Sequence, residues 1–143
     1  MLGNNNNSFN HLKIHTQYSI CEGALKIEDL KNHCKANKTI SVGLSDTSNL
    51  CGALEFSESL SKIGTQPIIG TQINFKYKEI IGLMPLFAMN ISGYKRIIEL
   101  SSKSYLENNG STEPHCDFSE LVKNNSGMAI FFRNYRWTYW KII

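Results

Sequence analysis

The sequence predicts an α/β domain in which parallel strands alternate with helices. Strand-like and helix-like segments follow one another along the chain, and glycine, proline or a capping residue marks the ends of most of them. The chain has 143 residues, of which 41% are hydrophobic and 19% are charged. This composition is ordinary for one globular domain, and the length is sufficient for a core.

The first strand and the first helix lie near the start of the chain. Residues 11–16 (HLKIHT) alternate between apolar and polar and predict a short strand. Residues 25–37 predict a helix with one apolar stripe, because their apolar side chains recur at helical spacing. That stripe consists of Ile27, Leu30 and Cys34.

A second strand and a second helix follow. Residues 39–46 (TISVGLSD) are apolar and β-branched at their start and predict a strand. Residues 50–63 predict a helix that Ser48 or Asn49 caps and that Gly64 ends. This completes two rounds of strand and helix.

The second half of the chain continues the pattern. Residues 66–78 and 80–90 predict two strands, residues 92–106 a helix, and residues 127–132 a fifth strand. A short helix ending near residue 124 is predicted from a capping box formed by Asp117 and Glu120. Ligands of parallel α/β sheets gather at the carboxyl ends of strands. His15, Asp46 and Gln72 fall at or near such ends.

Charge and targeting signals exclude several classes of function. The net charge is +3, the lysines are scattered, and no basic run predicts a nucleic-acid surface. The start of the chain lacks the apolar region of a signal peptide, and no apolar run approaches the about 20 residues of a membrane helix. Without a C-x-x-C pair, the cysteines predict reduced thiols in a cytoplasmic protein rather than a zinc site. They are Cys21, Cys34, Cys51 and Cys116.

Five segments, in order, resemble the N-terminal PHP (polymerase and histidinol phosphatase) domain of the bacterial DNA polymerase III alpha subunit. The resemblance covers about residues 9–131 and implies a PHP fold, which is an irregular parallel barrel of strands wrapped by helices. Because later strands are missing, we expect an incomplete barrel. The segments are HLKIHTQYSICEGALKIEDL, VGLSDTSNLCGALEF, QPIIGTQINF, GYKRIIELSSKSYLE and HCDFSELVKNNSGMAI.

The resemblance also implies a metal site that this chain has largely lost. Active PHP domains bind two or three zinc, manganese or iron ions through histidines and carboxylates, and these ions activate water. Two family histidines align with Lys13 and Thr47, a glutamate aligns with Gln72, and a further histidine aligns with Leu83. The positions that keep a family residue are His15, Glu22 and Asp46. We therefore expect no metal and no catalytic residue.

Lys13 suggests how the site is stabilised without a metal. A protonated amine has no lone pair for a divalent ion and repels it, whereas a carboxylate about 4 Å away gains about 4 kcal/mol at an effective dielectric near 20. Neutral oxygens of Thr47 and Gln72 compete poorly for zinc or manganese. We predict that the Lys13 ammonium replaces the cation and lies near Asp46 or Glu22.

Each retained residue also has a purely structural interpretation. His15 fits a hydrogen-bonded structural histidine, since its partner ligands are missing. Glu22 fits an exposed acid in a turn or first helical turn. Asp46 fits a local loop cap as well as a charge partner.

The two ends of the chain differ from its middle. Residues 1–8 predict a disordered polar tail. Residues 132–143 contain both tryptophans and do not resemble the turn and amphipathic helix that the family implies. With chosen codons, removal of one nucleotide near Phe131 restores that pattern, so a frameshift is one hypothesis. A divergent terminus on a standalone domain is the alternative.

The expected function follows from the family. The chain would be a fragment of a replicative DNA-directed DNA polymerase that lacks the polymerase site, with a structural or docking role at most. The resemblance implies binding to the proofreading exonuclease and other holoenzyme subunits, contact with DNA only through the missing polymerase region, magnesium only for the full-length polymerase, and no membrane. The alternative is a small standalone metal-dependent PHP phosphoesterase. An unpaired sheet edge would make the fragment marginally stable and prone to aggregation.

Overall fold

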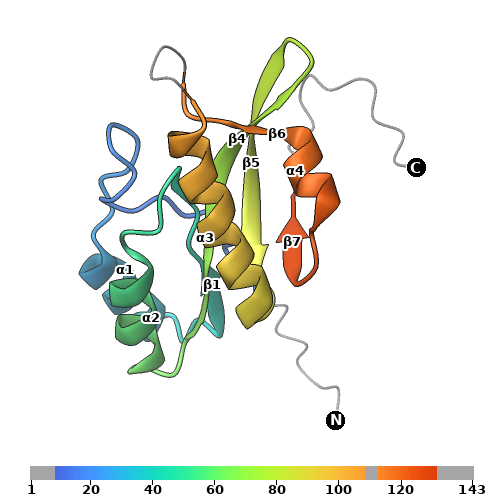
Figure 1. The fold of residues 1–143 in the computed structure, drawn as a ribbon. Helices are drawn as coiled ribbons and strands as arrows, with labels where there is room; N and C mark the ends of the chain where they lie inside the picture. Colours follow the sequence, from blue (N-terminus) through green and yellow to red (C-terminus); the bar gives the residue numbers. More distant parts are fainter. Residues whose placement is uncertain (1–8, 109–112, 132–143) are drawn as a thin grey trace.

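A computed structural model of the chain describes residues 9–108 and 113–131 (Figure 1). The predicted tails at residues 1–8 and 132–143 therefore lie outside the described residues. The helices are α1 (Ile27–Ala36), α2 (Ala53–Ser61), α3 (Ile91–Leu106) and α4 (Phe118–Lys123). The strands are β1 (Ser41–Gly43), β2 (Asp46–Thr47), β3 (Gln66–Ile68), β4 (Gly70–Tyr77), β5 (Ile80–Ala88), β6 (Cys116–Asp117) and β7 (Met128–Ile130).

The segment predicted as the first strand lies beside β1 without forming a regular strand. Ile14 and Thr16 make isolated parallel bridges, to Leu44 and Leu25 respectively. The backbones approach closely here, since a Cβ on Gly43 would lie 2.5 Å from the carbonyl oxygen of Leu12. Glycine at this position therefore allows the segment to follow the sheet.

β1 and β2 form one interrupted strand, and β3 and β4 form its parallel partner. The same residue offset relates Ser41 to Gln66 and Thr47 to Gln72, so the register is unchanged across the break. At the break the ladder continues through a single bond, in which the Leu44 N–H donates to the Ile68 carbonyl at 2.9 Å. This ladder matches the predicted parallel pairing.

The other half of the sheet adds two antiparallel pairs, which the strand and helix rhythm did not predict, while β6 pairs parallel with β4. β4 and β5 form a hairpin, and β5 pairs antiparallel with β7. Lys78 and Glu79 alone connect β4 to β5, and a connection of two residues permits only a hairpin. Lys78 has a φ of +53°, as such a tight turn requires.

The helix ends differ from the predicted caps. Asp117 precedes α4 but makes no side-chain cap bond. The residue that precedes α2 is Gly52, which has no side chain, and Asn49 accepts the Cys51 N–H at 3.0 Å before the helix begins. Asn90, which was not predicted, caps α3 by accepting the Gly93 N–H at 3.0 Å. Gly64 does follow α2 in the left-handed region, with a φ of +79°.

Alternate strand residues point to the helices and divide into two apolar clusters. In Figure 1 α1 and α2 lie at one end of the sheet, and α3 runs along β4 and β5. The first cluster joins α1, α2 and β1 through Ile27, Leu30, Cys34, Val42, Leu44, Ala53, Phe56 and Leu60. The second cluster contains Ile73, Phe75, Leu86, Ile97, Leu100, Cys116, Leu121 and Met128.

The face of β5 that points away from α3 is partly exposed. β4 lies along one edge of β5. On the other edge β7 pairs only with residues 86–88, so within the described residues the stretch from Ile80 to Met84 has no strand on that side. Ile81, Leu83 and Phe131 are exposed there and form what we call the open face. By strand alternation Gln72 lies on this same face of the sheet.

Candidate functional site

The fold brings most of the predicted site positions together. His15 and Glu22 come from the segment before α1, Thr47 from β2, and Gln72 from β4. β2 and β4 are adjacent and parallel, so Thr47 and Gln72 are register partners on one face. Asp46, the neighbour of Thr47, points to the opposite face.

Asp46 is inaccessible to solvent and its carboxylate is fully engaged. Oδ1 accepts the Thr16 N–H at 2.6 Å and the Ser19 hydroxyl at 2.7 Å, and Oδ2 accepts the Thr16 hydroxyl at 2.7 Å. The Thr71 hydroxyl donates to the backbone carbonyl of Asp46 at 2.6 Å. Asp46 thus joins three chain segments instead of capping its own loop.

Gln72 orients His15. The Gln72 amide nitrogen lies 3.1 Å from Nε2 of His15, and an amide nitrogen only donates. His15 Nε2 therefore accepts, which places the ring proton on Nδ1. Nδ1 faces the Ser19 hydroxyl at 3.4 Å and a Glu22 carboxylate oxygen at 3.7 Å.

Thr47 links the remaining groups. Its hydroxyl donates to the Glu22 carboxylate at 2.5 Å and receives the Gln72 amide at 3.3 Å. Its backbone N–H donates to the Ser19 hydroxyl at 3.1 Å. Thr47 and Gln72, two of the four positions that align with lost family ligands, therefore belong to one network of hydrogen bonds.

In the part of the chain that the structure describes, Lys13 makes no direct ion pair with the carboxylates near which its ammonium is predicted to lie. Lys13 is exposed, and among the described residues no ion pair within 4.0 Å joins it to Asp46 or Glu22. The physical reason is that Thr16 and Ser19 already satisfy Asp46, while Glu22 faces His15 and Thr47. Neutral donors hold these carboxylates where we expected an ammonium.

The donor set does not fit a PHP-type metal centre. His15 offers Nε2 to Gln72, the oxygens of Asp46 accept three bonds, and Thr47 and Gln72 are neutral. Within residues 9–108 and 113–131, no group of three histidine, cysteine, aspartate or glutamate side chains is arranged to hold a metal ion.

Two residues of the site were not predicted. Thr16 and Ser19 are inaccessible and supply the hydroxyls that bind Asp46. The available signal was the hydroxyl-rich stretch TQYS directly after His15. Its partner lies about 30 residues further on in sequence, which spacing alone does not reveal.

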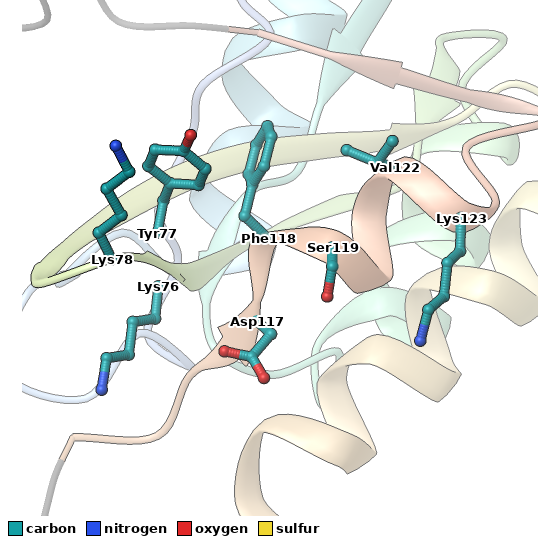
Figure 2. A pocket seen from close by; sticks show the side chains of 8 residues that line it. All are labelled: Lys76, Tyr77, Lys78, Asp117, Phe118, Ser119, Val122 and Lys123. Carbon is teal, nitrogen blue, oxygen red and sulfur yellow. The ribbon is translucent and has the colours of Figure 1, made fainter.

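A separate groove lies at the far end of the hairpin, beside α4 (Figure 2). Tyr77 and Phe118 meet edge to face there, with ring centroids 5.9 Å apart. The side chains of Lys76, Lys78 and Lys123 point in different directions in Figure 2, so they do not converge on one anion. The groove contains none of the candidate site residues; its lining is Lys76, Tyr77, Lys78, Asp117, Phe118, Ser119, Val122 and Lys123.

The family follows from comparison with known proteins. The family model for the PHP domain matches residues 11–132. The chain belongs to the PHP domain family. The fold agrees: a metal-dependent phosphoesterase of known structure from Bifidobacterium adolescentis superposes with a TM-score of 0.54 at 20% identity. That match covers 66% of this chain and 32% of the phosphoesterase.

Curated relatives of this PHP domain include DNA polymerase III alpha subunits. The Rickettsia conorii protein is 36% identical over 121 residues, covering 84% of this chain and 10% of the relative. The Helicobacter pylori protein is 39% identical over 110 residues, covering 71% of this chain and 9% of the relative. The PHP domain described here thus spans about a tenth of the length of these relatives.

Membrane insertion has no helical candidate in this PHP domain. Within the described residues, no helix combines the length and the apolar character that crossing a bilayer requires.

Proposed function

We propose that this chain is the N-terminal PHP region of a DNA polymerase III alpha subunit and acts as a structural and docking module. The 36% identity to the Rickettsia conorii alpha subunit supports the assignment. The whole enzyme would synthesise DNA with magnesium in its polymerase region. DNA would be contacted through that region and not through this domain.

One observation carries the non-hydrolytic part of the proposal. Gln72 and Thr47, which align with family metal ligands, donate hydrogen bonds to His15 and Glu22, which align with retained ligands. Nε2 of His15 and one oxygen of Glu22 are thereby engaged by neutral donors. A scaffold role requires only that this network keep the fold in place.

The open face supports the docking part. Leu83 and Ile81 are exposed on an uncharged stretch of β5 whose edge has no neighbouring strand in the described chain. Edges of this kind pair readily with another strand. The proposed partners are the remaining chain of the alpha subunit and, with it, the proofreading exonuclease and other holoenzyme subunits in the cytoplasm.

A binding experiment tests the docking role. The 143-residue chain is mixed with a relative's alpha subunit lacking its matched tenth, and separately with the exonuclease subunit, and complexes are measured by gel filtration with light scattering. We expect binding to the alpha subunit, weakened at least tenfold by Leu83→Lys and unchanged by Leu54→Lys, an exposed leucine on α2. Absence of any complex would refute the docking role.

A standalone metal-dependent phosphoesterase is the alternative, suggested by the name of the structural neighbour. Its test is metal analysis of purified protein together with hydrolysis of an aryl phosphate in zinc or manganese. We expect less than stoichiometric metal and no turnover. Metal at one or more equivalents with turnover that His15→Ala abolishes would replace the proposal with this alternative.

A further inference from the structure

The two apolar clusters are separated by buried polar side chains. Among the described residues, Leu50 alone packs against both clusters. Between the clusters lies a group that we call the polar seam, in which every residue is at most 2% exposed. The polar seam consists of Thr16, Ser19, Asp46 and Thr71.

The polar seam crosses the break in the strand pair. The parallel ladder is irregular at Leu44 and Ser45, directly before Asp46. Leu44 belongs to the first cluster, while Ile73, directly after Gln72, belongs to the second.

Bonds of the polar seam join segments that belong to different clusters. Thr16 and Ser19 follow Ile14, which packs on the first cluster, and they bind Asp46. Asp46 is bound in turn by Thr71 of β4, the strand that supplies Ile73. Gln72 adds a second connection from β4 through His15 to the same N-terminal segment.

We infer that the polar seam is the coupling element that makes the two clusters unfold together, with Thr71 as the residue that connects β4 to Asp46. The inference rests on the metal-free site of the proposed function, since a bound cation would supply the same connection. In the described residues every buried side-chain nitrogen and oxygen has a partner, so the network is complete. Removing one partner leaves a buried donor or acceptor unsatisfied, which costs more than the bond itself contributes.

Hydrogen exchange of the full 143-residue chain in increasing urea tests the inference, with peptides from α2 and α3 reporting the two clusters. We expect one shared midpoint for the natural chain. Thr71→Val, which removes the hydroxyl that donates to the Asp46 carbonyl, should separate the two midpoints by about 1 M urea. Gln66→Leu, at an exposed position of β3, should leave one midpoint.

Ser19→Ala, which removes the hydroxyl that donates to the Asp46 carboxylate, is the second variant, and it decides the question if Thr71→Val does not fold. Two midpoints in the natural chain, or one midpoint retained in the folded variants, would overturn the inference. A parallel series with zinc, manganese or EDTA separates it from the proposed function. A midpoint that rises with metal would refute the metal-free site, whereas metal-independent separation of the midpoints supports both.

Discussion

The two apolar clusters are stabilised in different ways. Around the first cluster, each of the ion pairs Lys31–Glu28 and Lys62–Glu58 joins two neighbouring side chains on the surface of one helix. Around the second, ion pairs join α3 to α4. Exposed pairs within a helix contribute little, whereas a network between helices fixes their relative position. The second cluster should therefore respond to charge and the first to packing alone.

Glu120 is the centre of the network at the second cluster. Its carboxylate lies 2.8 Å from the Lys103 ammonium and also contacts Lys123. Arg96, which is buried, donates to the Glu120 carbonyl at 2.6 Å and to the Asn124 carbonyl at 3.3 Å. These bonds attach the end of α4 to α3.

The largest effect is expected for a substitution that disrupts the first cluster. Phe56 is inaccessible and central to it, so Phe56→Ala should lower the free energy of unfolding by about 3–5 kcal/mol. Urea unfolding followed by circular dichroism measures this. Leu54→Ala, at a position 72% exposed on the same helix, should change stability by less than about 0.5 kcal/mol. Similar losses in both variants would contradict the assigned core.

A smaller effect is expected at a close backbone contact of the second cluster. A Cβ on Gly93 of α3 would lie 1.8 Å from the Gly127 carbonyl oxygen, so Gly93→Ala must push α3 away from β7. We expect a loss of about 1–3 kcal/mol in the same urea experiment. Ser102→Ala, at an exposed position of α3, is the control and should be neutral. An unchanged midpoint for Gly93→Ala would show that α3 does not pack as described.

Low pH should weaken the structure around the second cluster, which depends on an ion-pair network, more than the structure around the first. Hydrogen bonds from Lys103 and then Lys123 lower the pKa of Glu120 from 4.5 to about 2. A lowered folded-state pKa stabilises the fold fully above about 4.5, and this stabilisation is lost as the pH falls toward 2. Exchange protection of α4 should therefore decline in that window.

Glu120→Gln should remove this part of the pH dependence because the side chain no longer titrates. Glu28→Gln, in an exposed pair of α1, should leave the acid profile of α4 unchanged. An acid profile of α4 that is identical in the natural chain and in Glu120→Gln would contradict the assigned role.

The smallest effect is expected at Lys13. It is exposed and has no ion pair within 4.0 Å in the described chain, so Lys13→Met should shift stability by less than about 0.5 kcal/mol. Thermal unfolding measures the shift. A loss of several kcal/mol would revive the hypothesis that its ammonium replaces the metal.

The helices with a long apolar stripe were predicted correctly from the sequence. The helix expected at 92–106 spans Ile91–Leu106, and the one expected at 50–63 spans Ala53–Ser61. The hairpin was missed because Lys78 and Glu79 are not among the residues that usually form such turns. The expected capping box failed because the Glu120 side chain binds Lys123, one turn further along α4, and Lys103, which lies 17 residues earlier in the sequence.

The candidate site was predicted as a set of positions but not as a network. Alignment with the family identified His15, Glu22, Thr47 and Gln72, and the structure places them in contact. Formal charges alone predicted the Lys13 ammonium as the partner of the carboxylates, because the hydroxyl groups that can donate to them were not considered. Thr16 and Ser19 carry no charge, and they satisfy Asp46 from about 30 residues away.

The constant offset between the two parallel strand pairs has a consequence for sequence change. Asp46 points toward the helices and Thr47 toward the opposite side, and they pair with Thr71 and Gln72. Inserting or deleting one residue in either strand would exchange the two sides and misplace both sets at once. The side chains that face the helices and those that form the candidate site therefore depend on the same strand register. This stretch should tolerate substitutions far better than changes in length.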